Sequence, residues 1–222
     1  MVKENPILGI IGGGQLGSML AVAAKKLNIK TIILSDDLEA PAKNFCDELI
    51  ISDYNKVKNI EEFANKVDVV TFEFENIPFK ILEHIEKLKP VLPKPTVNHI
   101  VQNRFTEKKF ILNTAGAFNE LGIKTVKYAL IKEKTDILKN KDLLPGILKT
   151  CTLGYDGKGQ FIINNTEEVN KLEIDFDKEY ILEKKIILKK EISIIVTRFS
   201  NNECLIFDPF ENYHVNQILN RS

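Results

Sequence analysis

The sequence predicts an α/β protein of two domains: a parallel-sheet, Rossmann-like domain over residues 1–100, then an α+β domain over residues 101–222. Three observations support this prediction. Strand-like apolar runs alternate with helical patterns up to about residue 95, which is typical of a parallel sheet covered by helices. Pro93 and Pro95 then interrupt the pattern. After Gly122 the strand-like runs become denser and less regularly separated by helices.

The first domain is expected to begin with a strand and to alternate. Short apolar runs predict strands at 7–11, 30–34, 48–51, 68–72 and 91–92. Helices are predicted between them, over 15–27, 60–66 and 79–88; in the first, apolar residues recur at helical spacing. Asn59 is suited to cap the second helix, and Pro78 is suited to begin the third.

The second domain is expected to open with a helical stretch from residue 96 that continues through 104–110. Strands are predicted at 128–131, 147–149, 161–163, 180–183, 192–197 and 205–207, with a short helix over 166–172. The segment 112–118 interrupts the helical pattern with small, unpatterned residues.

Composition excludes several classes of protein. The 31 basic and 31 acidic residues balance, which argues against a nucleic-acid partner bound through bulk charge. No apolar run is long enough to span a membrane, and the N-terminus lacks the apolar core of a signal peptide. Cys46, Cys151 and Cys204 are too widely spaced for a disulfide framework or a metal cluster and fit a reducing compartment. We therefore expect a cytoplasmic location.

A glycine-rich loop is the most informative feature of the second domain. It follows Lys149 and holds Gly154, Gly157 and Gly159, with Lys158 between the last two. Glycines let backbone N–H groups approach an anion closely, and the lysines supply charge for a phosphate. A flexible β-turn with solvated lysines explains the same residues.

A second glycine-rich segment, residues 12–17, fits the G-x-G-x-x-G pattern between a strand and a helix. Asp36 lies about 20 residues further on, as a dinucleotide-binding site requires. The helix N-terminus favours an anion, so NAD binding is a serious interpretation. The alternative is that these glycines only allow a tight turn, although Gln15 places a polar group at the helix start.

Two carboxylates, Glu73 and Glu75, follow the strand predicted at 68–72. Ligands of open α/β sheets bind at this edge, and alternation along a strand places both side chains on one face. We expect them to face one crevice and to hold an amine or ribose hydroxyls. The alternative is a solvated loop in which Asn76 caps the next helix.

A third group of polar residues follows the strand at 180–183. The backbone after Glu183 is suited to hydrogen-bond an adenine, and Glu191 to bind ribose hydroxyls, although a charged surface turn explains the same residues. His214 lies among polar groups after a later strand, where a phosphate or substrate contact competes with a structural role.

Taken in order, these segments resemble the ATP-grasp superfamily and, within it, the N5-carboxyaminoimidazole ribonucleotide synthase family of purine biosynthesis. The matching runs are 12–17, 71–78, 103–104 with 107–108, 154–160 and 211–216. The resemblance covers nearly the whole chain from residue 7. It implies a pre-ATP-grasp domain followed by an ATP-grasp domain of which only the N-terminal part is present.

The resemblance also implies ATP-dependent carboxylation of 5-aminoimidazole ribonucleotide with bicarbonate. By motif match, the nucleotide would be held by Arg104, Lys149, Gly154, Tyr155, Asp156, Gly157, Lys158, Gly159, Gln160, Glu183, Lys184, Lys185, Ile186, Glu191 and His214. The ribonucleotide would be held by Gln15, Leu16, Glu75 and Tyr155, with Asp156 and Lys158 as catalytic residues that position bicarbonate.

The chain departs from the family in two places. Residues 112–118 look inserted, and family members continue well beyond the run at 211–216. The family's acidic Mg²⁺ ligands are expected in that further part, so we assign no metal ligand here. An inactive remnant, or half of a split enzyme completed by a separate C-terminal chain, is therefore an alternative to an active synthase. A homodimer is compatible with the family, and an NAD-binding protein is the weaker alternative.

Overall fold

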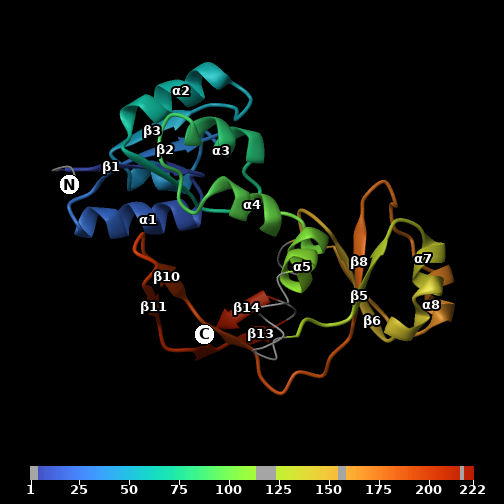
Figure 1. Ribbon diagram of the computed structural model, residues 1–222. Coiled ribbons are helices and arrows are strands. Elements are labelled where there is room, and N and C mark those ends of the chain that lie inside the picture. The colour runs from blue at the N-terminus through green and yellow to red at the C-terminus, as the bar shows by residue number, and fades with distance from the viewer. Residues whose placement is uncertain (1–4, 114–123, 155–158, 216–217) are drawn as a thin grey trace. The chain divides into compact units, whose positions relative to one another are not determined.

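The computed structural model describes residues 5–113, 124–154, 159–215 and 218–222, and it divides into two compact units, 1–103 and 104–222 (Figure 1). The first unit is built on four parallel strands in the order β3-β2-β1-β4. These strands are β1 (Ile7–Ile11), β2 (Lys30–Ser35), β3 (Glu48–Ile51) and β4 (Val69–Phe72). The parallel sheet predicted from alternating strands and helices is confirmed.

Both faces of this sheet are covered, which explains why its strands are continuous apolar runs. On one face Ile11 packs in a cluster with Phe63 of α2 (Val57–Lys66) and Leu82 of α3 (Phe79–Glu86). On the other face Ile10 packs against Ala21 of α1 (Gln15–Lys26), next to the 3-10 helix η1 (Pro41–Asn44). Successive residues of β1 therefore serve opposite layers.

Four local predictions for this unit and its boundary were wrong. Helix α2 begins at Val57, and Asn59 lies inside it and donates to Ser52 Oγ at 3.0 Å instead of capping. Helix α3 ends at Glu86, and Val91 makes only an isolated bridge to Val70. The long helix predicted from residue 96 is two helices, α4 (Pro95–Val101) and α5 (Arg104–Asn113).

The second unit contains an antiparallel sheet in the order β5-β8-β6-β7. Its strands are β5 (Tyr128–Ile131), β6 (Gly146–Thr150), β7 (Gln160–Ile163) and β8 (Tyr180–Lys184). The helices α7 (Lys134–Lys139) and α8 (Thr166–Asn170) cover one face, and the 3-10 helix η2 (Lys141–Leu143) leads into β6. Asn165 caps α8 by accepting from the amides of Glu167 and Glu168.

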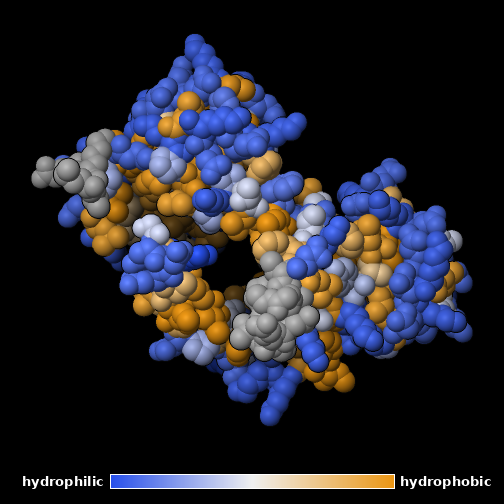
Figure 2. Space-filling model, viewed as in Figure 1, coloured by the Kyte–Doolittle hydropathy of each residue, from blue (hydrophilic) through white to orange (hydrophobic). Residues whose placement is uncertain are grey.

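Beyond β8 the chain forms three two-stranded ribbons and no larger sheet among the residues described. They pair β9 (Ile192–Ser193) with β12 (Phe210–Glu211), β10 (Val196–Arg198) with β11 (Cys204–Ile206), and β13 (Tyr213–Val215) with β14 (Ile218–Arg221). The single strand predicted at 192–197 is therefore divided in two. No described residue after Glu183 is buried, and apolar side chains lie open around β10 and β11 (Figure 2).

We expect Phe63→Ala to lower the free energy of unfolding by about 3–5 kcal/mol, because the fully buried ring would leave a cavity under the sheet. Leu38→Ala, at a residue that is 68% exposed, should change it by less than about 0.5 kcal/mol. Urea unfolding followed by circular dichroism measures both. Equal effects of the two substitutions would contradict the assignment of Phe63 to the core.

Candidate functional site

The glycine turn after β1 is held by a carboxylate from the residue that follows β4. Glu73 Oε1 accepts from the amide of Gly14 at 2.7 Å, and Glu73 Oε2 accepts from the amide of Gly17. These amides belong to the N-terminus of α1, where unpaired N–H groups and the helix dipole favour a negative charge. Gly12 has φ of +103°, and a Cβ at Gly14 would lie 2.8 Å from Glu73 Oε1. The glycines therefore make room for the protein's own anion.

This contact counts against the NAD-binding interpretation. A dinucleotide pyrophosphate would need the same helix N-terminal amides that Glu73 now occupies. The glycines at 12–17 also have the packing role that the alternative interpretation assigned to them, since a Cβ at Gly17 would lie 2.5 Å from the carbonyl oxygen of Gly12.

Glu73 and Glu75 face one cavity, as expected, but strand alternation is not the reason. Strand β4 ends at Phe72, so the alternation does not continue through the turn that follows. Both residues line a cavity of about 220 Å³, but the Glu73 oxygens are engaged by the glycine turn. Glu75 is exposed, and Gln15 and Leu16 are exposed at the start of α1. Asn76 does not cap α3, whose N-cap is Pro78.

In the second unit, three predicted or matched residues from different elements form a buried ion cluster. Glu183 of β8, 8% exposed, accepts from Lys149 Nζ of β6 at 2.7 Å and pairs with Lys108 Nζ of α5 at 2.9 Å. Lys149 and Glu183 belong to adjacent antiparallel strands, which brings their side chains to one face. The cluster holds two positive charges and one negative charge, so a net positive charge faces this side of the sheet.

Burial by itself would raise the pKa of the Glu183 carboxyl, because a charged form is costly away from water. The hydrogen bonds and charges of Lys149 and Lys108 outweigh burial, and the pKa lies below the usual value of 4.5. Glu183 is therefore ionised at neutral pH and holds both ammonium groups in place.

Arg104 holds the first part of the glycine-rich loop. Its guanidinium donates from Nη1 to the Thr150 carbonyl at 3.1 Å and from Nη2 to the Gly154 carbonyl at 3.0 Å. On the other side, the Thr150 amide donates to the carbonyl of Gly159, which has φ of +70°. Gln160 then begins β7. The loop residues Tyr155, Asp156, Gly157 and Lys158 lie outside the described residues.

The residues expected around the nucleoside lie at and after the end of β8. Lys184 Nζ donates to the carbonyls of Asp142 and Leu144, at 3.0 and 2.5 Å, so its ammonium supports η2. The Lys185 amide donates to the Pro145 carbonyl at 3.0 Å, and Ile186 is 55% exposed.

Two further residues of this set are brought together across the ribbons. His214 Nδ1 lies 3.5 Å from Glu191 Oε1. The predicted nucleotide residues of the second unit thus fall into four described groups: the ion cluster, the two ends of the glycine loop, residues 184–186 after β8, and the contact between His214 and Glu191.

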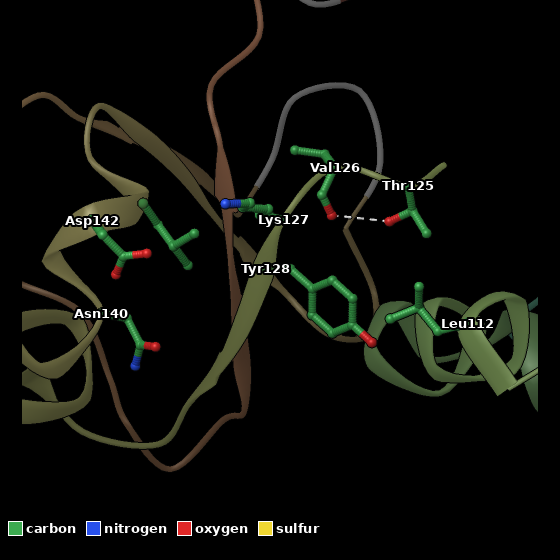
Figure 3. Close-up of a pocket in the computed structure, with 8 residues that line it drawn as sticks. Leu112, Thr125, Val126, Lys127, Tyr128, Asn140 and Asp142 are labelled. Atoms are coloured by element: carbon green, nitrogen blue, oxygen red, sulfur yellow. Dashed lines mark hydrogen bonds between the residues drawn. The ribbon is translucent and has the colours of Figure 1, made fainter. Parts of the chain in front are cut away.

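A cavity that the sequence did not indicate lies beside β5. It has a volume of about 520 Å³, and Figure 3 shows Tyr128 between Leu112 and the polar residues of η2 and the turn before it. It is lined by Leu112, Thr125, Val126, Lys127, Tyr128, Asn140, Asp142 and Leu143. None of these residues was predicted to bind a ligand, because their types form no recognisable motif.

The structure also bears on metal and thiol chemistry. Within the described ranges, no group of three His, Cys, Asp or Glu side chains is placed to hold a metal ion. Cys151 is buried, and its burial raises the pKa of the thiol to about 11, with a smaller contribution from Glu179. It is therefore protonated at neutral pH, consistent with a strand-end residue.

No described helix is long and apolar enough to cross a membrane.

Comparison with known proteins matches both units. Residues 6–102 match the model of the ribonucleotide synthetase preATP-grasp domain, and residues 116–222 match that of the ATP-grasp domain. N5-carboxyaminoimidazole ribonucleotide synthase of Brucella melitensis is 37% identical over 98% of this chain and 60% of its own length. The Bacillus subtilis synthase is 37% identical over 100% of this chain and 57% of its own length.

Solved structures give the same result. The crystal structure of the Staphylococcus aureus synthetase complexed with ADP has a TM-score of 0.87 and 37% identity, over 98% of this chain and 57% of that chain. The Thermus thermophilus synthetase has a TM-score of 0.82 and 29% identity, over 96% and 56%. The chain thus spans somewhat more than half the length of the relatives that it matches.

We expect Glu73→Gln to lower the free energy of unfolding by roughly 1.5–3 kcal/mol, because a neutral amide cannot accept from both Gly14 and Gly17 with the strength of a carboxylate. Glu62→Gln, at an exposed position of α2, serves as the matched control and should have little effect. Urea unfolding of both variants checks this. Equal stability would show that the glycine turn does not depend on the carboxylate.

Because of Glu183, the free energy of unfolding should fall as the pH becomes acidic. Its pKa in the folded protein lies below its unfolded value, so its contribution is complete above about pH 4.5 and is lost as pH falls through the lower folded pKa. Urea unfolding between pH 3 and 7 should show a steeper acid loss in the unmodified protein than in Glu183→Gln. Parallel pH profiles would contradict the ion cluster.

Proposed function

The chain belongs to the ATP-grasp family, and on this premise we propose that it binds ATP and serves the carboxylation of 5-aminoimidazole ribonucleotide. The family assignment rests on the two matched domain models together with 37% identity to N5-carboxyaminoimidazole ribonucleotide synthases. The observation that carries the proposal is the ion cluster of Lys108, Lys149 and Glu183 in the same unit as the Arg104-held glycine loop.

The proposed reaction has two steps. A bicarbonate oxygen attacks the γ-phosphorus of ATP, so ADP leaves and carboxyphosphate forms. The substrate amine then attacks the carboxyl carbon, phosphate leaves, and the amine loses a proton. Carboxyphosphate hydrolyses readily, so the site must be closed and must hold cations along the phosphates.

We assign nucleotide binding to the second unit. Lys149 is held beside Glu183 with its ammonium in a cationic cluster, which suits a triphosphate oxygen. Arg104 uses one N–H of each terminal nitrogen on the loop, which leaves other donors of its planar group for phosphate. By the resemblance to the family, we assign phosphate binding to the glycine loop, residues 154–160, and the positioning of bicarbonate to Asp156 and Lys158.

The backbone of residues 183–186 would pair with adenine, and Glu191 with His214 would bind the ribose side. Gln15, Leu16 and Glu75 of the first unit, together with Tyr155, would contact the ribonucleotide. A Mg²⁺ ion would neutralise phosphate charge in such a reaction. The described residues do not form a carboxylate site that fits it, and we derive no step through the metal.

The ribbons after β8 support a proposal about partners. Large apolar side chains of these strands are exposed, from Ile206 at 65% to Tyr213 at 47%. Isolated two-stranded ribbons are marginally stable in water. We propose that further polypeptide, in the same or a separate chain, covers them and completes the site, in the cytoplasm. Alternatively, a second copy of the chain covers these side chains and forms a homodimer. For the function, the alternative is that the chain is an inactive remnant of the enzyme.

Addition of a polypeptide with the unmatched two-fifths of the Bacillus subtilis synthase tests this proposal. We expect a stable one-to-one complex that binds ATP and carboxylates 5-aminoimidazole ribonucleotide, measured by light scattering and incorporation of labelled bicarbonate. A complex without activity would favour the inactive remnant. A homodimer that excludes the added polypeptide would contradict the proposed cover.

In the complex, or in the chain alone if it binds ATP, Lys149→Met should raise the Kd for ATP at least tenfold because a phosphate cation is removed. Lys171→Met, an exposed lysine after α8, should leave the Kd unchanged. Isothermal titration calorimetry with a non-hydrolysable ATP analogue gives both values. Equal affinities would remove Lys149 from the site, and binding of NADH would favour the dinucleotide alternative.

A further inference from the structure

Lys108 of α5 is a member of the ion cluster that the protein itself surrounds. Its Nζ lies 2.9 Å from Glu183 Oε1, 3.5 Å from Thr125 Oγ1 and 5.7 Å from the centroid of the Tyr128 ring. The face of an aromatic ring and a hydroxyl oxygen both attract an ammonium group. The side chain of Lys108 is only 16% exposed, so its charge is satisfied largely within the protein.

The packing of α5 against β5 fixes the place of this ammonium group. Tyr128 stands opposite Glu183 in the register of β5 and β8, so both side chains lie on one face of the sheet. Phe105, one turn before Lys108 on α5, meets the Tyr128 ring edge-on, with the ring centroids 6.0 Å apart. Tyr128 therefore contacts two residues of α5 and holds Lys108 beside the carboxylate.

The two lysines of the cluster use different oxygens of the same carboxylate. Lys108 Nζ faces Glu183 Oε1, and Lys149 Nζ donates to Glu183 Oε2 at 2.7 Å. One lysine can therefore leave without displacing the other. If Lys149 turns toward a phosphate, Glu183 keeps the ammonium of Lys108. Without Lys108, the same movement would leave a buried carboxylate with neither cation of the cluster, which is costly.

We propose that Lys108 is a positioning residue: it remains with Glu183 and thereby frees Lys149 to bind the triphosphate. Lys108 acts through the carboxylate and does not touch the nucleotide. This inference deepens the proposed function and rests on it, because it concerns the same phosphate cation. It assigns the two lysines of the cluster different tasks, although both contact Glu183 at similar distances.

The affinity for ATP tests the role of Lys108, in the complex or in the chain alone if it binds ATP. Lys108→Met should raise the Kd for a non-hydrolysable ATP analogue about fivefold, measured by isothermal titration calorimetry. Lys108→Arg keeps the positive charge and should restore most of the affinity. Lys109→Met, at the exposed neighbouring position of α5, is the matched control and should leave the Kd unchanged. Equal affinities of Lys108→Met and the unmodified protein would overturn the proposal.

A second background separates action through Glu183 from direct contact with a phosphate. In Glu183→Gln no carboxylate competes for Lys149, so adding Lys108→Met should raise the Kd by less than about twofold. If Lys108 bound a phosphate itself, or only supported the packing of α5, its loss would weaken binding about fivefold in both backgrounds. That outcome would overturn the proposal.

The unmodified protein supplies a spectroscopic test that requires no loss of charge. The ¹H–¹⁵N signals of the two ammonium groups are assigned with Lys108→Arg and Lys149→Met. The ATP analogue should shift the signal of Lys149 strongly and that of Lys108 little. Equal shifts would show that both lysines meet the phosphates and would overturn the proposal. This measurement decides if Lys108→Met fails to fold by circular dichroism.

The outcome can be separated from that of the proposed function. If the unmodified protein, in the complex and alone, binds no ATP, the proposed function fails and this inference fails with it. If the unmodified protein binds ATP and Lys149→Met weakens binding while Lys108→Met does not, the proposed function stands and the role of Lys108 alone is overturned.

Discussion

The first unit is organised by the backbone amides at the N-terminus of α1, which need hydrogen-bond acceptors from outside the helix. The amides of Gly14 and Gly17 have no partner within the helix, and the Glu73 carboxylate from the far end of β4 binds them. This contact joins β1 and β4, which are neighbours in the sheet, at their carboxyl ends. It also requires glycines where a Cβ would meet the carboxylate, so a motif that resembles a phosphate site here serves an internal anion.

In the second unit, a buried carboxylate holds two positively charged side chains together. Two lysines from α5 and β6 would repel each other near the sheet, and the buried Glu183 between them makes their approach favourable. A buried carboxylate with two ammonium partners leaves one positive charge in excess. An anionic ligand placed against this cluster would find the cations already oriented, which lowers the entropy lost when it binds.

The two units differ in how far their apolar surface is covered. The first unit buries both faces of its sheet, and the second buries one face under α7 and α8. The ribbons beyond β8 bury none of their described residues, although they are rich in isoleucine, leucine and valine. Such composition is that of strands in a core, and the chain spans 60% and 57% of the length of two synthases that it matches.

The sequence by itself determined most of the order of strands and helices, because continuous apolar runs and helical spacing are local patterns. It did not predict the short helix α7 or the ribbon strands β12, β13 and β14. It also indicated the family, through motifs in a fixed order. Only the tertiary structure decided that Glu73 binds the glycine turn, that Lys108 joins Lys149 at Glu183, and that Asn98 keeps an unpaired oxygen. Each of these depends on contacts between residues 21 to 75 positions apart, and spacing along the chain contains no information on which distant groups meet.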